Sequence, residues 1–405
     1  MNEPKLRFKA DDGSQFPDWE EKTIDELGTF TKGAPLSKAD ISECGSPLIL
    51  YGELYTTYKE VAYNIQRKTQ AVVDEKYYSC VGDVIIPTSG ESAEDISTAT
   101  CVMTPGVVLG GDLNIFRSNI LDGRIMSYIL NHQAKWKIAA IAQGKSIVHI
   151  QAKQLSNIHV KYPVSKAEQQ KIADFLSTID TVIAKQKETV SAWEERKKGV
   201  MQKLFSQEVR FKADDGSDFP EWEEKKLEDI TSQYKVRNKK RLPLEIYSVN
   251  NIVGFIPQSE QFDDAGYLKD TDTSIYMIVP PKHFAYNPAR LDVGSIGYQY
   301  LDHDVQVSSL YEVFETSNLV NDEFLWSWFH THYFNNVVKR LQEGGVRLYF
   351  YYDKMQEVKI GLPSLPEQQK IADCLSSLDE VIEKQKATLA AWEELKKGLL
   401  QQMFA

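Results

Sequence analysis

Apolar side chains recur at alternating steps of three and four along two long stretches of the chain, 168–205 and 367–404. The positions in the first stretch are Leu176, Ile179, Ile183, Gln186, Val190, Trp193, Lys197, Val200 and Leu204. Those in the second are Leu375, Leu378, Ile382, Gln385, Leu389, Trp392, Lys396, Leu399 and Met403. A seven-residue repeat of this kind is typical of helices that pack side by side as a coiled coil. The pattern therefore predicts two rods of roughly 55–60 Å each.

Polar residues occupy matching positions in the two seams: Gln186 and Gln385, then Lys197 and Lys396. A polar seam residue can fix the register of a coiled coil at some cost in stability. The same positions could instead lie near the ends or the edge of the helix contact. The sequence leaves both interpretations open.

The two helical stretches belong to a longer internal repeat. EQQKIADFLS from residue 168 matches EQQKIADCLS from 367, and the similarity continues for the length of the helix. LRFKADDGSQFPDWEEK from residue 6 matches VRFKADDGSDFPEWEEK from 209. The first copy of this second motif stands at the N-terminus, whereas the other copy directly follows a helix, so the order is circularly permuted. A closed body with a pseudo-twofold axis would bring the chain ends together and make the helices antiparallel.

Two segments between the repeats, 28–160 and 231–360, differ from each other over most of their length. Short apolar runs bounded by Gly and Pro, such as GDVIIPTS and SIYMIVPP, predict buried strands. Apolar residues at helical spacing predict one helix from residue 124 and one from residue 322. Both segments end with a helix, a glycine and a short apolar run, which favours a common fold beneath different surfaces.

The predicted fold class is α/β, with two globular α/β domains separated by two long antiparallel coiled-coil helices. The expected parts are an N-terminal repeat segment at 1–27, a first globular domain at 28–162, a central repeat with a long helix at 163–230, a second globular domain at 231–362, and a C-terminal repeat helix at 363–405.

Composition excludes several classes of protein. The 405 residues are 42% hydrophobic and 11% aromatic, which excludes a disordered chain. No apolar run reaches the roughly 18 residues of a membrane span, and the charged N-terminus lacks the apolar core of a signal peptide. The four cysteines are scattered, so we expect neither a zinc site nor a disulfide framework. We predict a soluble cytoplasmic protein with no membrane partner.

Net charge at first argues against a nucleic-acid partner, because the whole chain carries −11. Segments 28–160 and 231–360 carry only 0 and −3, so most of the acidity lies in the repeats. Five basic residues also cluster within seven positions: Lys235, Arg237, Lys239, Lys240 and Arg241. Such a cluster suits phosphate contacts, although a solvated basic loop is the alternative.

Motifs for catalysis are missing from the sequence. It contains no phosphate-binding loop of the G-x-x-x-x-G-K-[ST] type, no G-x-S-x-G turn and no H-E-x-x-H pair. Glu20 with Lys22 and Glu223 with Lys225 have the Glu-x-Lys spacing of metal-dependent nucleases, but neither pair has a suitably spaced acidic partner. We therefore predict a non-catalytic chain with no catalytic residue, metal or cofactor of its own.

This plan resembles the DNA-specificity subunit of type I restriction-modification enzymes. The resemblance covers essentially the whole chain, and its most specific parts are the paired helix starts EQQKIADFLS and PEQQKIADCLS. GDVIIPTSGESAEDI, GGDLNIFR, GFIPQSEQF and YNPARLDVGSIGYQY look like target-recognition-domain sequences of that family. One departure is that Val346 and Arg347 stand where the first segment has Ser146 and Ile147, which limits the transfer of contacts between segments.

The resemblance implies that each variable segment is a target-recognition domain for one half of a split site in double-stranded DNA. It implies that the two helices set the gap between the half-sites. It also implies two methyltransferase subunits that carry S-adenosylmethionine and dock on the repeats, and two motor-nuclease (restriction) subunits that use ATP and Mg. The chain itself would then supply recognition without catalysis.

Candidate DNA-binding residues follow from exposed loops and from side-chain chemistry. Arg can contact guanine and Asn adenine through paired hydrogen bonds, and hydroxyl groups between a strand and a glycine suit an exposed loop. In the first domain the candidates are Thr88, Ser89, Gly90, Lys145, Ser146 and His149. In the second they are Arg237, Lys239, Lys240, Arg241, Asn250, Asn251, Arg290, Arg347 and Tyr349. Each could instead be a turn residue or a surface charge.

Two other functions fit the same plan. One is the specificity chain of a related methyltransferase–nuclease fusion system, which only its partner chains would distinguish. The other is a non-catalytic coiled-coil protein–protein scaffold or adaptor. Salt-dependent DNA binding by the variable segments would separate a DNA reader from an adaptor.

Overall fold

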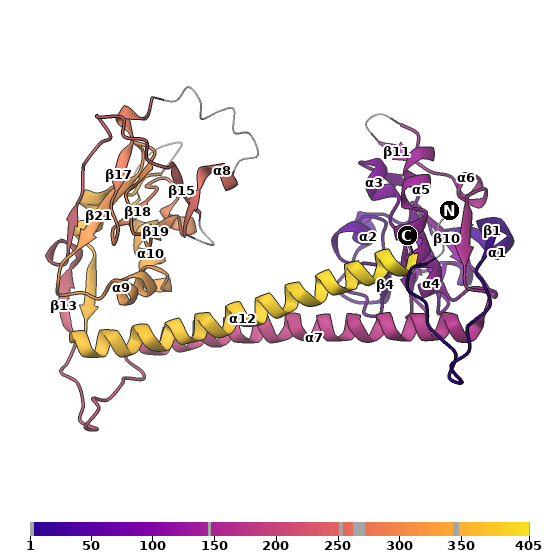
Figure 1. The fold of residues 1–405 in the computed structure, drawn as a ribbon, viewed down its shortest axis with the longest axis horizontal. Helices are drawn as coiled ribbons and strands as arrows, with labels where there is room; N and C mark the ends of the chain where they lie inside the picture. Colours follow the sequence, from indigo (N-terminus) through magenta and orange to yellow (C-terminus); the bar gives the residue numbers. More distant parts are fainter. Residues whose placement is uncertain (1–3, 145–146, 251–253, 262–271, 343–347, 405) are drawn as a thin grey trace. The chain divides into compact units, whose positions relative to one another are not determined.

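The computed structural model describes residues 4–404, apart from 145–146, 251–253, 262–271 and 343–347. The chain divides into two compact units (Figure 1). Unit 1 comprises Met1–Lys187 and Ala387–Ala405, and unit 2 comprises Glu188–Lys386. Two long helices, α7 (Lys166–Phe205) and α12 (Leu365–Phe404), therefore contribute to both units. Within the described residues, no helix combines the length and the apolar character of a membrane span.

The two long helices pack against each other in opposite directions. In unit 1 the start of α7, with Leu176, shares a hydrophobic core with the end of α12, with Leu400 and Phe404. In unit 2 the end of α7, with Leu204, shares a core with the start of α12, with Leu375. The antiparallel pairing predicted from the internal pseudo-twofold axis is confirmed.

Matching lysine–aspartate pairs join the two helices once in each unit. Lys396 Nζ lies 2.7 Å from Asp180 Oδ1 in unit 1, and Lys197 Nζ lies 2.5 Å from Asp379 Oδ1 in unit 2. Lys396 is only 7% exposed, which does not fit a position at the edge of the contact. Burial removes the hydration of a charge, and only a well-aligned partner compensates for that loss. The Lys396–Asp180 pair therefore suits the interpretation that polar seam residues fix the register.

Unit 1 contains a central five-stranded sheet in the order β2-β10-β6-β8-β4. Its strands are β2 (Thr29–Lys32), β4 (Val61–Ala62), β6 (Asp83–Pro87), β8 (Thr100–Val102) and β10 (Leu113–Arg117). Smaller sheets pair β3 (Ser46–Ile49) with β5 (Arg67–Thr69) and β9 (Val108–Leu109), and β7 (Ser89–Gly90) with β11 (Val148–His149). Its short helices include α1 (Ile24–Leu27), α2 (Glu53–Thr56), α3 (Ala93–Ile96) and α6 (Ala152–Ser156).

Unit 2 contains a four-stranded sheet in the order β14-β21-β18-β19. Its strands are β14 (Thr231–Gln233), β18 (Phe284–Tyr286), β19 (Ile296–Tyr298) and β21 (Glu312–Thr316). Two further pairs are β15 (Tyr247–Asn250) with β16 (Gly254–Pro257), and β17 (Met277–Val279) with β20 (Val305–Val307). The short helices α8 (Gln258–Gln261) and α11 (Tyr352–Gln356) belong to the same unit.

The two units share a framework despite their different sequences. The strand order β2-β10-β6 of unit 1 corresponds to β14-β21-β18 of unit 2. Each unit also has a two-stranded sheet just before its long helix. These sheets pair β1 (Glu20–Thr23) with β12 (His159–Tyr162), and β13 (Glu223–Lys226) with β22 (Lys359–Leu362).

The helix expected from residue 322 is in fact two helices, α9 (Asp322–Phe329) and α10 (His332–Leu341). Thr331 causes the break, because its hydroxyl accepts a hydrogen bond from Phe334 N at 3.2 Å and caps the second helix. The helix expected from residue 124 is also divided, into α4 (Gly123–Tyr128), a π-helical stretch (Ile129–Gln133) and α5 (Lys135–Ile141). Apolar spacing continues across such breaks, so the prediction of single helices was wrong.

The N-terminal segment from Lys5 and the end of α12 meet in unit 1 (Figure 1). The backbone N–H groups of Lys5 and Leu6 donate to Gln402 O at 2.9 and 3.1 Å. At the equivalent place in unit 2 the chain runs on without a break from α7 into the second copy of the N-terminal repeat, at 206–210. This arrangement is the one that the permuted repeats predict.

A buried glutamate anchors each copy of the repeat to the start of a long helix. Arg7 Nε and Nη2 donate to Glu168 Oε1 and Oε2 at 3.0 and 3.1 Å, and Trp19 Nε1 donates to Glu168 Oε1 at 3.3 Å. In unit 2 the same contacts join Glu367 to Arg210 and to Trp222. Both glutamates are 0% exposed. Paired charge-assisted hydrogen bonds of this geometry are strong and directional. The sequence RFKADDGS-x-FP-x-WEEK, present in both copies, supplies the arginine and the tryptophan that make these contacts.

We expect Glu168→Gln to lower the stability of unit 1 by about 2–3 kcal/mol, because the amide cannot accept two hydrogen bonds from a guanidinium. The measurement is the midpoint of urea unfolding. Glu188→Gln, on an exposed position of α7, is the matched control and should change stability by less than ~0.5 kcal/mol. Equal effects of the two substitutions would contradict the anchoring role.

Candidate nucleic-acid interface

One backbone hydrogen bond occurs at the same place in both units and marks a shared junction. Ile150 N donates to Thr88 O in unit 1, and Phe350 N donates to Pro288 O in unit 2, each at 3.0 Å. In each unit this bond joins the loop after a central strand, β6 or β18, to the segment before a short helix, α6 or α11. The two units therefore present different side chains from one common framework.

In unit 1 the junction carries small polar side chains. Ser89 Oγ lies 3.0 Å from His149 Nδ1, and the two residues face each other across the β7–β11 pair. Tyr55 OH donates to Ser89 O at 3.3 Å, and Thr88 Oγ1 donates to Asp112 Oδ1 at 3.4 Å. The structure thus brings together the candidates Thr88, Ser89, Gly90 and His149.

Gly90 has a packing reason to be glycine. A Cβ atom built there would lie 3.2 Å from both Cβ and N of Ile96, at the end of α3. The absence of a side chain lets α3 approach β7 closely, which keeps Ser89 and His149 beside a fixed helix.

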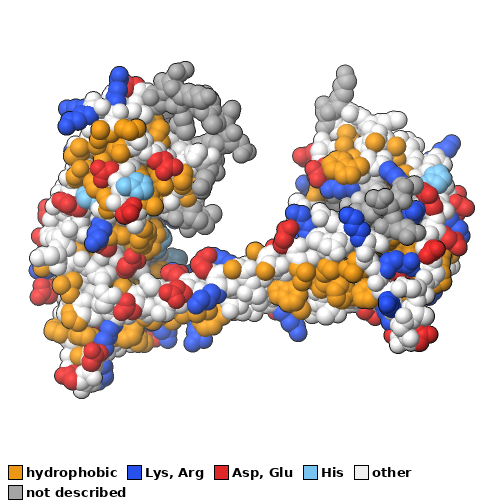
Figure 2. All heavy atoms as spheres, viewed as in Figure 1, with side chains coloured by type: hydrophobic (Ala, Val, Ile, Leu, Met, Phe, Trp, Pro, Cys, Tyr) orange, Lys and Arg blue, Asp and Glu red, His pale blue; other side chains and the backbone are white. Residues whose placement is uncertain are grey.

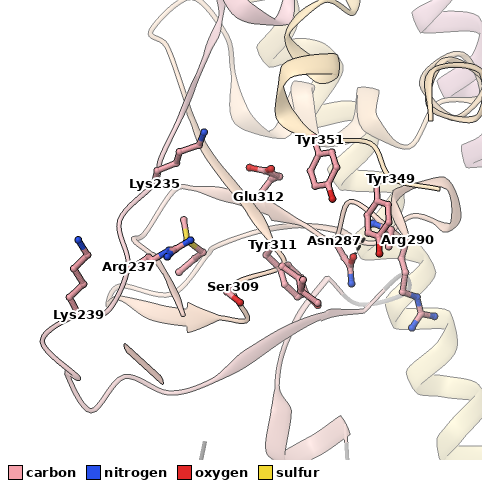
Figure 3. Close-up of a pocket in the computed structure, with 13 residues that line it drawn as sticks. Lys235, Arg237, Lys239, Asn287, Arg290, Ser309, Tyr311, Glu312, Tyr349 and Tyr351 are labelled. Atoms are coloured by element: carbon pink, nitrogen blue, oxygen red, sulfur yellow. Dashed lines mark hydrogen bonds between the residues drawn. The ribbon is translucent and has the colours of Figure 1, made fainter. Parts of the chain in front are cut away.

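In unit 2 the junction opens into a cavity of about 950 Å³ (Figure 3). Thirteen residues from several segments line this cavity: Lys235, Arg237, Lys239, Met277, Asn287, Ala289, Arg290, Ser309, Leu310, Tyr311, Glu312, Tyr349 and Tyr351.

The cavity has walls of different chemistry. Figure 3 shows Lys235 and Arg237 on one side, and Tyr349, Tyr351 and Arg290 on the other. The rings of Tyr349 and Tyr351 are parallel within 5°, with centroids 5.5 Å apart. Residues two apart on an extended chain point to the same side, which explains how both rings reach this wall.

The cavity is electropositive although the whole chain is acidic. Its four cations, Lys235, Arg237, Lys239 and Arg290, have no ion pair with any carboxylate in the described part of the chain. Glu312 is the one carboxylate among the lining residues, and its Oε2 accepts from Gln233 Nε2 at 2.5 Å. Burial raises the pKa of Glu312, against the opposing effects of Gln233 and Lys235. Elsewhere, on the face shown in Figure 2, Lys and Arg side chains are mixed with carboxylates.

The candidates of unit 2 that lie within the described residues divide into three groups. Arg237, Lys239, Arg290 and Tyr349 line the cavity. Lys240 and Arg241 are exposed but are not lining residues, and Arg241 Nη2 lies 3.3 Å from Asp272 Oδ1. Asn250 is half-buried at the end of β15, opposite Gly254. The remaining candidates, Lys145 and Ser146 of unit 1 and Asn251 and Arg347 of unit 2, lie outside the described residues.

Several lining residues were missed in the sequence. Tyr351 could have been found, since it stands two residues after the candidate Tyr349. Lys235 belongs to the basic cluster noted above. Asn287, Tyr311 and Glu312 carry no local signal, because only the folded sheet brings the ends of β18 and β21 beside the basic segment.

A buried hydrogen bond supports the aromatic wall from behind. Tyr352 OH and Thr231 Oγ1 lie 2.8 Å apart, and Thr231 Oγ1 donates to Leu227 O at 2.8 Å. Tyr352 is 2% exposed and begins α11 directly after Tyr351. Its fixed position limits the movement of the neighbouring ring.

Comparison with known proteins identifies the family. The family model described as "Type I restriction modification DNA specificity domain" matches residues 17–191 and 220–391. The chain belongs to this family. Two matches in one chain make it a two-domain type I specificity subunit, and subunits of this kind are non-catalytic. Among the described residues, no group of three or more His, Cys, Asp or Glu side chains could hold a metal ion.

Two relatives come from Methanocaldococcus jannaschii. The MjaVIII type I restriction enzyme specificity subunit is 23% identical over 418 residues, which cover 97% of this chain and 94% of the relative. The putative MjaX type I restriction enzyme specificity subunit is 22% identical over 419 residues, with the same coverage.

Two solved structures share the fold. The type I restriction-modification S subunit from M. genitalium matches with a TM-score of 0.57 and 16% identity, over 100% of this chain and 99% of that one. A chain from a study of complex assembly and conformational transition in a type I restriction-modification system matches with a TM-score of 0.54 and 14% identity, over 96% and 98%. At sequence identities this low, the structural similarity supports the fold of this chain and nothing further.

We expect Tyr352→Phe to destabilise unit 2 by about 0.5–1.5 kcal/mol, because it removes one buried hydrogen bond and leaves the ring in place. Thermal unfolding of the full chain is the measurement. Tyr333→Phe, which removes an exposed hydrogen bond to Lys359 O, is the control and should have little effect. No difference between the two variants would show that the Thr231 contact does not support the aromatic wall.

Proposed function

We propose that this chain reads a bipartite sequence in double-stranded DNA, with one half-site for unit 1 and the other for unit 2. The observation that carries the proposal is the shared junction, at which one framework presents different side chains. Sequence is read by side chains that reach base edges, whereas phosphate contacts only position a protein on the duplex. Two readers that share a fold but differ in their exposed side chains suit two different half-sites.

The side chains at the two junctions differ in chemistry, which supports recognition of a different half-site sequence by each unit. In unit 1, Ser89 offers a hydroxyl group and His149 offers ring nitrogens for hydrogen bonds to bases. Arg237 and Arg290 offer guanidinium groups in unit 2, which suit guanine edges or phosphates. The acidic repeats repel phosphate, so DNA contact is expected from the variable segments.

We propose that the long helices set the gap between the half-sites. α7 passes from unit 1 into unit 2 at residues 187 and 188, and α12 returns at 386 and 387. A continuous helix resists bending and compression, since each turn is held by backbone hydrogen bonds. The number of helical residues would then set the number of base pairs between the half-sites.

We propose that the duplicated repeats bind two copies of one methyltransferase subunit. The exposed turns at 9–15 and 212–218 are nearly identical, and each is closed by a single bridge between its ends. Lys171 Nζ lies 2.5 Å from Asp11 Oδ1, and Lys370 Nζ lies 2.6 Å from Asp214 Oδ1, so both turns are held against a long helix in the same way. Those methyltransferase subunits would carry S-adenosylmethionine, and two restriction subunits would use ATP and Mg.

A DNA target also suits a location in the cytoplasm. The four cysteines, all within the described residues, are unpaired, as is usual in a reducing compartment. A coiled-coil adaptor without DNA contact has no comparable support, because it gives no reason for four cations around one cavity that form no ion pair among the described residues.

Exchange of residues 231–362 for the same segment of another family member should change one half-site and leave the other intact. The reason is that unit 1 keeps all of its own base-reading side chains. Sequencing of methylated sites in cells that carry the chimera together with its methyltransferase measures the outcome. Exchange of 28–162 is the matched control and should change the opposite half-site. A change of both half-sites by either exchange would show that the units read DNA jointly.

Insertion of one heptad into each long helix should widen the gap and preserve both half-sites. Seven helical residues add about 10 Å, which corresponds to roughly three base pairs at ~3.4 Å each. The insertion belongs in both helices at facing positions, so that the seam stays in register. The same mapping of methylated sites serves as the measurement, and altered half-sites with an unchanged gap would contradict the role of the helices.

A further inference from the structure

Unit 2 has a cavity, although recognition of bases in a DNA groove does not require one. A duplex is read by side chains that protrude into its grooves, whereas a hollow receives a group that projects from the nucleic acid. Phosphates are the groups that project from an intact duplex, and they are small. A cavity of about 950 Å³ lies instead in the size range of small-molecule sites.

The walls of the cavity match two parts of a nucleotide, the phosphate and the base. Lys235, Arg237 and Lys239 supply positive charge for a phosphate on one side. On the other side, Tyr349 and Tyr351 supply aromatic faces on which an unstacked base can lie. Tyr351 is 50% exposed, so part of its ring surface is open for contact with a base.

Polar groups between the walls can read a base edge. Asn287 Oδ1 already accepts from Ala289 N at 3.0 Å, so the side chain offers its amide N–H groups as donors. Glu312 is an acceptor that suits an exocyclic amino group. Asn287 and Glu312 are half-buried, which is the environment in which a hydrogen bond discriminates between bases.

We propose that this cavity binds one nucleotide whose base lies outside a base stack, with the phosphate at Arg237 and the base against Tyr351. The proposal rests on the proposed function for its main source of ligand, which is a nucleotide of the DNA target turned out of the duplex. A free nucleotide has the same chemistry and is the second source.

Unit 1 provides an internal comparison. His149 and Gln151 precede and follow Ile150 there, at the places of Tyr349 and Tyr351, and Gly90 takes the place of Arg290. The junction of unit 1 therefore has neither the pair of rings nor the cation beside it. An unstacked nucleotide is expected in the half-site of unit 2 and not in that of unit 1.

The experiment uses the full-length chain without a methyltransferase, so that no other subunit can unstack a base. Duplexes that contain the mapped target carry 2-aminopurine at one position at a time, in and beside each half-site. The fluorescence of this base rises when it leaves the stack. We expect a several-fold rise at one position in the half-site of unit 2 and none in the half-site of unit 1.

Matched variants assign the signal to the cavity. Tyr351→Ala should abolish the rise and weaken binding of the target roughly tenfold, because one base–aromatic contact is lost. Tyr351→Phe keeps the ring and should keep the signal. Arg237→Ala should weaken binding, whereas Lys339→Ala, which removes an exposed charge on α10, should leave the fluorescence rise intact.

A second arm tests the free nucleotide. Adenosine 5′-monophosphate is titrated against the chain and against Tyr351→Ala. Saturable binding that the variant loses, with no fluorescence rise in any duplex, would support the cavity as a nucleotide site with a free ligand. Sequence-specific duplex binding with neither effect would overturn this proposal and leave the proposed function standing. Absence of sequence-specific duplex binding would instead overturn the proposed function.

Discussion

The buried contact between an arginine and a glutamate at the start of each long helix is the interaction on which the architecture depends. Arg7 with Glu168 and Arg210 with Glu367 tie the repeat segments to the long helices, and an indole N–H adds a third hydrogen bond in each copy. A carboxylate with no solvent exposure is tolerable only if such partners are present. The contact therefore fixes where each repeat segment lies, and with it the first strand of each unit.

The repeats and the variable segments have different roles, and this explains why the repeats are alike in sequence while the variable segments differ. The repeats are alike because they make the same buried contacts and the same reciprocal lysine–aspartate pairs in both units. The variable segments share a framework that includes three corresponding strands and one backbone hydrogen bond at the junction. Everything exposed at that junction is free to differ, which is what two readers of unlike sequences require.

The sequence predicted the scaffold far better than the site. The heptad seam, the permuted repeats and the meeting of the chain ends follow from periodicity and repetition, which are visible along the chain. The break at Thr331 was missed, since a cap acts through one hydroxyl while apolar spacing continues on both sides. The cavity of unit 2 could be predicted only in part, because Glu312 and Asn287 reach it from strands that are distant in sequence and adjacent only in the sheet.

The way in which the ends of the chain meet has a consequence for synthesis on the ribosome. The core of unit 1 includes Leu400, Met403 and Phe404, which follow the whole of unit 2 in the sequence. Unit 2 is built from one uninterrupted stretch that ends at residue 386. Domains usually fold from the N-terminus as they emerge, but here the core of unit 1 is completed only by residues that are made after the whole of unit 2. A chain that stops about ten residues early would therefore lose part of the core of its first unit and keep its second.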